Sequence, residues 1–138
     1  MKRRTFIAGL GGAATWPLVA RAQQGDRVRR SGVLMNLAAD DPETLRRMAA
    51  FRQGLQELGW ADGRNLQFDY RYGQGDADRY RRYAAELVAL APDVILAAGG
   101  TVVGALQQAT RAVPIVFVLV SDPVTRGLVA NLPRPGEN

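Results

Sequence analysis

Two apolar runs constrain the fold more strongly than any other feature of this sequence. They lie within DVILAAGG (93–100) and VPIVFVLVSDP (113–123), and they are apolar at successive positions rather than at alternate ones. Continuous apolar character is typical of strands buried on both faces of a parallel sheet. The segment TVVGALQQAT (101–110) between them predicts a short helix, because parallel strands need a crossover connection.

The rest of the chain also alternates between strand and helix patterns. SGVLMNL (31–37) predicts a first strand, and DDPETLRRMAAFRQGLQELG (40–59) predicts a helix. LQFDYRY (66–72) alternates apolar and polar residues, as a strand at a sheet edge does. DADRYRRYAAELVALAP (76–92) predicts a second helix. The sequence therefore predicts an α/β fold, a doubly wound parallel sheet with strand order 2-1-3-4.

Several expectations about burial follow from this arrangement. The first helix is expected to present one apolar face, formed by Leu45, Met48, Phe51, Leu55 and Leu58. The two continuously apolar strands are expected to bury Ile95, Leu96, Val116 and Val118, whereas Gln67, Asp69 and Arg71 are expected to be more exposed on the half-wet second strand. A further helix is expected to begin near Thr125 and to include residues 127–132.

The first 22 residues have the three zones of an export signal. Lys2, Arg3 and Arg4 form a cationic end, and residues 6–20 are uncharged but too few to span about 30 Å of hydrocarbon comfortably. The small residues Ala20 and Ala22 then favour cleavage between Ala22 and Gln23. Arg3-Arg4 followed by Phe6 is similar to a twin-arginine signal, which directs export of folded proteins to the periplasm.

Removal of this signal would change the charge of the protein. Without Lys2, Arg3, Arg4 and Arg21, 14 of the 18 basic residues remain against 13 acidic ones, and the formal charge falls from +5 to +1. The remaining arginines are interleaved with acids, and no stripe of basic and aromatic residues is left for stacking on bases. We therefore expect no nucleic-acid partner.

Composition also excludes several kinds of chemistry. The chain has no cysteine and no histidine, so a Ser-His-Asp triad, a cysteine nucleophile, a disulfide and the usual zinc sites are all excluded. Asp40-Asp41 and Asp76-x-Asp78 could suggest a metal site. Each pair directly precedes a helix, however, where carboxylates cap backbone amides. We expect no catalytic residue, no metal and no cofactor.

A candidate binding site lies at the carboxyl ends of the strands, where ligands gather in sheets of this kind. Asn36 follows the first strand and carries both a donor and an acceptor. Gly99 would let a ligand approach the backbone, and Thr101 opens a helix whose positive end favours a carboxylate. Ser121 could orient a ligand through its hydroxyl, and Asp122 could hold an ammonium group. Each residue also has an ordinary turn or capping explanation, so the hypothesis depends on their convergence.

The sequence resembles a family of ABC-transporter substrate-binding proteins over nearly its whole length. The segments that carry the resemblance are RRSGVLMNLAADDPETLRRMAAFRQGLQELGW, GRNLQFDYRYGQGDADRYRRYAAELVALAPDVILAAGG, ALQQATRAVPIVFVLVSDPV and GLVANLPRPG. The resemblance implies one lobe of a periplasmic-binding-protein-like clamshell that binds a small solute, such as tryptophan or tyrosine, and delivers it to an ABC permease. Asn36, Gly99, Thr101, Ser121 and Asp122 are the matching rim positions.

Members of that family are longer than this chain. The resemblance therefore implies that residues 23–138 are an N-terminal lobe without its second lobe, a truncated form expected to bind weakly. Two alternatives remain, a flavodoxin-like or a receiver-type α/β domain. A receiver domain needs a lysine at the strand ends, but Lys2 is the only lysine, and MNLAADD lacks the Ser/Thr-rich cradle of a flavin site. The effector domain of a repressor would carry a DNA-binding helix-turn-helix instead of an export signal.

Overall fold

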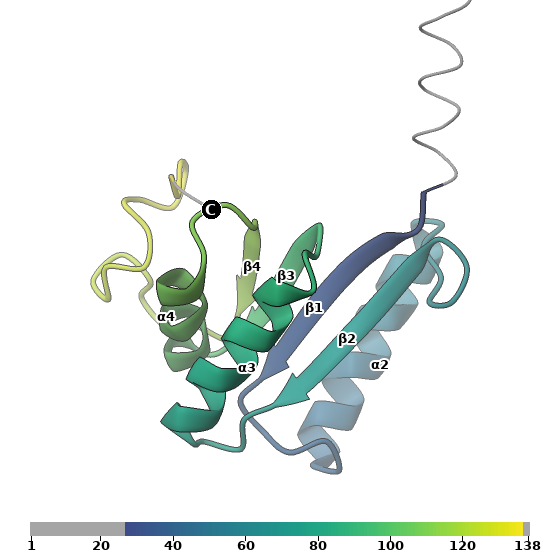
Figure 1. Ribbon diagram of the computed structural model, residues 1–138, viewed down its shortest axis with the longest axis horizontal. Coiled ribbons are helices and arrows are strands. Elements are labelled where there is room, and N and C mark those ends of the chain that lie inside the picture. The colour runs from purple at the N-terminus through teal and green to yellow at the C-terminus, as the bar shows by residue number, and fades with distance from the viewer. Residues whose placement is uncertain (1–26, 137–138) are drawn as a thin grey trace, which may run out of the picture.

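The computed structural model describes residues 27–136, which form a parallel sheet with helices on both faces (Figure 1). The expected export signal, with its expected cleavage between Ala22 and Gln23, lies outside the described residues. In chain order the elements are β1 (Arg29–Met35), α2 (Pro42–Glu57), β2 (Leu66–Tyr72), α3 (Ala77–Ala89), β3 (Val94–Ala98), α4 (Gly100–Ala109) and β4 (Ile115–Val118).

The sheet has the predicted topology. Its strand order is β2-β1-β3-β4, and every neighbouring pair is parallel. β1 pairs with β2 from Arg29↔Leu66 to Met35↔Tyr72, so these two strands run side by side over their full lengths. The predictions of an α/β fold, of the order 2-1-3-4 and of an edge position for β2 are confirmed.

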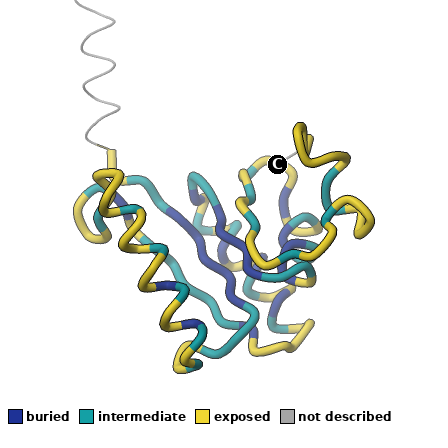
Figure 2. The backbone as a smooth tube through the Cα atoms, turned by 180° about the vertical axis from the view of Figure 1, so that it is seen from behind, coloured by how far each residue is buried: buried dark blue, intermediate teal, exposed yellow. Residues whose placement is uncertain are grey.

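Apolar side chains form a core on each face of the sheet. The buried residues gather along the strands in the middle of the molecule (Figure 2). On one face α3 and α4 pack against the sheet through a buried cluster that includes Leu34, Leu87, Ile95 and Leu106. On the other face α2 contributes Met48 to a smaller cluster with Val33, Met35, Leu96 and Ala98. Within residues 27–136, α3 and α4 therefore cover one side of the sheet and α2 covers the other (Figure 1).

The single helix α2 explains why part of the burial prediction was wrong. Ile95 and Leu96 are buried as expected, but Val116 and Val118 are 53% and 42% exposed. Their side chains alternate with those of Ile115 and Phe117, which pack on the α3–α4 side. Among the described residues, no helix covers β4 on the α2 side, so two apolar side chains of this strand face solvent.

Two further expectations also need correction. Leu45 on α2 and Leu58, which directly follows this helix, are 57% and 76% exposed, because α2 packs through a narrower stripe centred on Met48. The segment expected to form a helix over 127–132 consists of turns and bends. Gly127 adopts a positive φ of 69° and two prolines follow at 133 and 135, and each of these features opposes a continuing helix.

One residue of each acidic pair, Asp41 and Asp76, caps the helix that follows, in agreement with the prediction. Asp41 accepts hydrogen bonds from the backbone N–H groups of Glu43 and Thr44, and Asp76 accepts them from Asp78 and Arg79. The hydrogen bonds from Arg79 and Asp78 favour the charged carboxylate of Asp76 and hold its pKa below its ordinary value. Within residues 27–136, no group of three or more acidic, histidine or cysteine side chains is placed to hold a metal ion.

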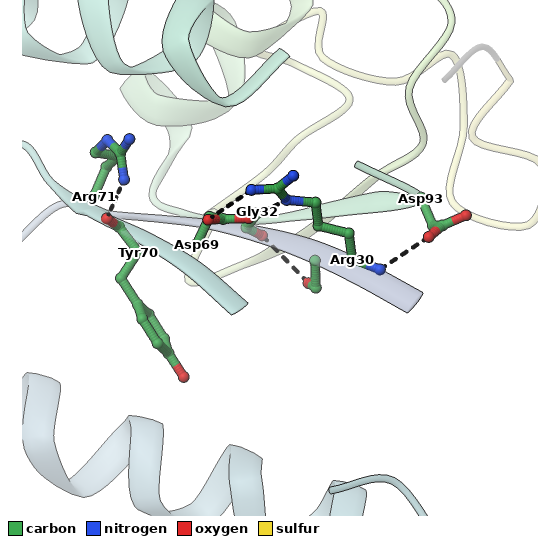
Figure 3. Close-up of polar contacts among 7 residues, drawn as sticks. Arg30, Gly32, Asp69, Tyr70, Arg71 and Asp93 are labelled. Carbon is green, nitrogen blue, oxygen red and sulfur yellow. Dashed lines mark hydrogen bonds and ion pairs between the residues drawn. The ribbon is translucent and has the colours of Figure 1, made fainter. Parts of the chain in front are cut away.

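Charged side chains join the β1 and β2 strands and tie β1 to the start of β3 (Figure 3). The Arg30 guanidinium donates to both carboxylate oxygens of Asp69, and Arg71 pairs with Glu86 of α3 at 2.9 Å. At the amino end of β3, Asp93 accepts the backbone N–H of Arg30 at 2.9 Å. That hydrogen bond, together with nearby arginines, lowers the pKa of Asp93. Gln67 is exposed, whereas Asp69 and Arg71 are half-buried by these ion pairs.

Candidate functional site

The predicted rim lies where β1 and β3, the two central strands, end side by side. The chain leaves β1 at Asn36 and returns over the sheet through α2, whereas it leaves β3 at Gly99 and enters α4 on the opposite face. Such a reversal opens a crevice at the carboxyl ends of the strands, and ligands of doubly wound sheets bind there. The geometry of the described residues is consistent with this general rule.

Asn36 and Gly99 lie in contact across this reversal. A Cβ atom placed on Gly99 would lie 3.5 Å from the Asn36 Cβ and 3.6 Å from its Nδ2. Gly99 has a φ of 101°, a conformation that residues with a side chain rarely adopt. The Asn36 Oδ1 atom is buried and accepts no hydrogen bond from the described residues. A buried acceptor without a donor lowers the stability of the fold, so the Asn36 Oδ1 atom would gain from a hydrogen bond donated by a ligand.

The amino end of α4 supplies the second part of the site. Gly99 is the N-cap residue and makes no side-chain capping hydrogen bond, because it has no side chain. The first N–H groups of a helix have no acceptor within the helix and carry a partial positive charge. Thr101 lies in this first turn and is exposed. The end of α4 can therefore accept an anionic group from solvent.

Arg126 is a rim residue that the sequence analysis missed. Its Nη1 atom would lie 3.2 Å from a Cβ atom placed on Gly100, so the guanidinium lies against the first residue of α4. Arg126 lies after β4, in the segment that the sequence predicts to be helical. That prediction gives no reason to place the Arg126 side chain beside α4. Its guanidinium adds a full positive charge beside the positive end of the helix.

Ser121 and Asp122 lie in the exposed loop after β4. Asp122 has a φ of 50°, and its Oδ1 atom accepts the backbone N–H of Thr125 at 3.1 Å. Hydrogen bonds from Thr125 lower the pKa of the Asp122 carboxyl group, and the Arg126 charge adds to this effect. The carboxylate thus stabilises its own turn in this structure. Asn36 and Gly99 are brought together, whereas Ser121 and Asp122 lie in the loop that carries Arg126 and are in contact with neither of them in the described structure.

Tyr80, on α3, is a second residue whose role at the rim the sequence does not reveal. Its hydroxyl donates to the Asn36 carbonyl oxygen at 3.2 Å and accepts the Gly75 N–H at 3.0 Å. The Gly75 N–H also donates to the Asn36 carbonyl at 3.0 Å. An aromatic residue on the apolar stripe of a helix gives no signal for such a contact. Tyr80 fixes the backbone that carries the Asn36 side chain.

Taken together, the rim offers complementary polar groups for a small zwitterion. The end of α4 and Arg126 can receive a carboxylate, and the Asn36 Oδ1 atom can accept a hydrogen bond from an ammonium group. Gly99 leaves space for a ligand to approach the backbone between them.

A second concavity lies at the opposite end of the strands. It has a volume of about 490 Å³ between α2 and the sheet, and its lining is mainly apolar. Phe51, Trp60, Phe68, Leu96 and Val116 are among the lining residues. This concavity contains none of the rim residues, and it is distinct from the candidate binding site.

Comparison with protein families gives a match over most of the chain. A family described as ABC transporter substrate binding protein matches residues 35–138. A curated relative, the tyrosine-binding protein of Clostridioides difficile, is 28% identical over 113 residues, which are 82% of this chain and 33% of the relative. The chain thus spans about a third of the length of that relative.

Three solved structures have the same fold over about four-fifths of this chain. A conserved domain protein from Vibrio cholerae is 33% identical with a TM-score of 0.70, covering 81% of this chain and 37% of that one. An ABC domain in complex with L-Trp from Streptococcus pneumonia is 25% identical with a TM-score of 0.73, and the match covers 80% of this chain and 37% of that one. A ligand-free, open substrate-binding protein with adhesive properties from Clostridium difficile is 29% identical with a TM-score of 0.73, and this match also covers 80% of this chain and 37% of that one.

Proposed function

Because this chain belongs to the ABC transporter substrate binding protein family, we propose that it binds a small solute for an ABC uptake transporter. Members of this family are binding proteins rather than enzymes. The proposed partners are therefore a solute at the carboxyl ends of the strands and an ABC permease in the inner membrane. We further propose that residues 23–138 correspond to one lobe of a clamshell.

The proposed solute is an amino acid. The single observation that carries this proposal is the buried Asn36 Oδ1 atom beside the positive end of α4. An α-amino acid presents an ammonium group and a carboxylate a short distance apart, and the rim offers an acceptor next to a cationic end. The names of two similar proteins, one tyrosine-binding and one solved with L-Trp, support the same class of ligand.

Each rim residue has a proposed role in this complex. Asn36 accepts from the ammonium group, and Gly99 allows the ligand to approach. Thr101 and Arg126 contact the carboxylate at the end of α4. Ser121 and Asp122 contact the solute from the loop after β4, and for Asp122 such a contact would compete with its present hydrogen bond to Thr125.

Titration of the ¹⁵N-labelled chain with L-tryptophan, followed by NMR, tests the proposal. Polar contacts that remain accessible to water contribute about 0.5–1.5 kcal/mol each, so we expect a dissociation constant of about 1 mM or weaker. Amide shifts should concentrate at residues 36, 99–101 and 121–126. Tryptamine lacks the carboxylate and should leave residues 100 and 101 unshifted, whereas indole-3-propionate lacks the ammonium group and should leave residue 36 unshifted.

Two variants control this titration. Asn36→Leu removes the acceptor and should abolish saturable shifts at the rim, whereas Gln108→Ala, an exposed change on the same helix α4, should leave them intact. Shifts confined to the apolar concavity at the other end of the strands, or no saturable shift at all, would contradict an amino-acid site at the rim.

We also propose that the protein acts outside the cytoplasmic membrane. The twin-arginine pattern of residues 1–22 supports export to the periplasm. In the described residues, no helix has both the length and the apolar character needed to cross a bilayer. N-terminal sequencing of the exported protein should begin at Gln23, and the change of Arg3 and Arg4 to lysine should leave a reporter fusion in the cytoplasm. Export that is unaffected by this double change would exclude the twin-arginine route.

A further inference from the structure

The carbonyl oxygen of Asn36 accepts two hydrogen bonds just beyond the end of β1. One comes from the Tyr80 hydroxyl at 3.2 Å and the other from the Gly75 N–H at 3.0 Å. The same Gly75 N–H also donates to the Tyr80 hydroxyl oxygen at 3.0 Å, so the three groups form a closed triangle. A carbonyl oxygen has two lone pairs, and each of them has a donor here. The main chain of Asn36 is therefore held at a point where β1 has already ended.

Tyr80 itself has little freedom to move. Its side chain is buried, and the ring packs directly against Gly73, which follows β2. Its main chain lies in the first turns of α3, where its N–H donates to the Asp76 carbonyl oxygen at 3.0 Å. A tyrosine side chain has only two torsion angles, so a ring that is fixed on both sides also fixes its hydroxyl. The hydroxyl can therefore act as a rigid support for the Asn36 main chain.

The Asn36 side chain needs such a support if it is to bind a ligand. Asn36 is half-buried but its Oδ1 atom is fully buried, so this atom reaches a ligand only after a rotation about the side-chain bonds. A rotation brings Oδ1 to a defined position only when the main chain stays in place. Hydrogen bonds weaken steeply with poor geometry, and a binding group has to lie within about 0.5 Å of its productive position.

We propose that Tyr80 is a positioning residue for the amino-acid site, and that its hydroxyl strengthens binding of the solute's ammonium group by acting through Asn36. Tyr80 does not touch the solute, because its ring is buried and its hydroxyl is engaged by Asn36 and Gly75. The inference rests on the proposed function and adds one residue to it. The carboxylate of the solute is assigned to the amino end of α4, so loss of the Tyr80 hydroxyl should weaken the contact with one end of the solute only.

Titrations of the ¹⁵N-labelled 138-residue chain and of its Tyr80→Phe variant, followed by NMR, test this inference. Phenylalanine keeps the buried ring and removes the hydroxyl alone. L-tryptophan and tryptamine carry an ammonium group, so Tyr80→Phe should raise their dissociation constants about threefold to tenfold. Indole-3-propionate lacks that group, and its dissociation constant should change by less than about twofold. A merely structural role of Tyr80 would weaken the binding of all three ligands alike.

Tyr83→Phe is the matched control, because it removes a hydroxyl from the same helix and leaves the hydrogen bonds to Asn36 in place. The Tyr83 ring packs against the core on the α3–α4 side and lies beneath the Arg82 guanidinium. This variant should bind all three ligands as the unaltered chain does. Hydrogen exchange without any ligand gives a second readout. Exchange of the Gly75 N–H should be faster in Tyr80→Phe, which removes one of its two acceptors, and unchanged in Tyr83→Phe.

The outcomes that overturn this inference differ from those that overturn the proposed function. If Tyr80→Phe binds L-tryptophan at the rim as tightly as the unaltered chain does, the amino-acid site stands and Tyr80 has no part in it. An equal loss of affinity for all three ligands, in a variant that circular dichroism shows to be folded, would leave Tyr80 a general structural role. Unchanged exchange at Gly75 would show that the hydroxyl does not hold this turn. The absence of saturable rim shifts in the unaltered chain would contradict the amino-acid site itself, and this inference with it.

Discussion

Replacing Gly73 by alanine is expected to lower the free energy of unfolding by about 3 kcal/mol. A Cβ atom on Gly73 would lie 2.1 Å from Cε1 of the Tyr80 ring and 2.2 Å from Cδ1, far inside van der Waals contact. Tyr80 is only 4% exposed, and its hydroxyl is held by Asn36 and Gly75. The ring cannot move aside without losing those hydrogen bonds. Chemical denaturation followed by circular dichroism measures the change.

Gly54→Ala is the matched control, because it adds the same methyl group where no atom lies within 4 Å. Gly54 is in the interior of α2, so this change should stabilise the protein by about 0.5–1 kcal/mol. In a double-mutant cycle, Gly73→Ala should lower the free energy of unfolding less in the Tyr80→Leu background than in the unaltered chain, because the smaller side chain relieves the clash. Equal effects of Gly73→Ala and Gly54→Ala would show that the Tyr80 ring does not occupy the position described.

Leu87→Ala is expected to lower the free energy of unfolding by about 3 kcal/mol or more. Leu87 is fully buried on α3, and its Cδ2 atom would lie 3.4 Å from a Cβ atom on Gly32 of β1. Its truncation leaves a cavity between the helix and the sheet, where the closely packed strands can relax only in part. Thermal unfolding provides the measurement, and a loss of this size should lower the Tm by about 12 °C or more.

Leu58→Ala is the control for this prediction, because Leu58 follows α2 and is 76% exposed. Its truncation should change the free energy of unfolding by no more than about 0.5 kcal/mol. A similar loss for both leucines would mean that the difference in burial between them does not exist in solution.

Most of the fold could be predicted because its signals are local in the sequence. Continuous apolar runs mark β3 and β4, alternation marks the edge strand β2, and Asp41 and Asp76 mark the beginnings of helices. The burial of Val116 and Val118 could not be predicted in this way. An apolar pattern shows that a strand can be buried, but what covers it depends on where α2 packs, which is a tertiary property.

The site was predictable to the extent that topology determines it. Asn36 and Gly99 follow adjacent parallel strands, so their proximity follows from the strand order. The approach of Arg126 to Gly100 depends on the path of a loop with no regular structure, and no pattern in the sequence encodes that path. No pattern in the sequence shows that the Asp122 carboxylate accepts the Thr125 N–H either. This hydrogen bond would compete with a contact between Asp122 and a ligand.

The Tyr80 hydroxyl has a mechanical consequence for the rim. It connects the backbone of Asn36, at the tip of β1, to the turn that leads into α3, and it does so between residues 44 positions apart in the chain. A movement of the β1 tip that leaves α3 in place would break this link, at a cost of about 1 kcal/mol. The tip and the start of α3 therefore tend to shift as a single body, so that a displacement imposed at Asn36 is transmitted to a helix on one outer face of the sheet.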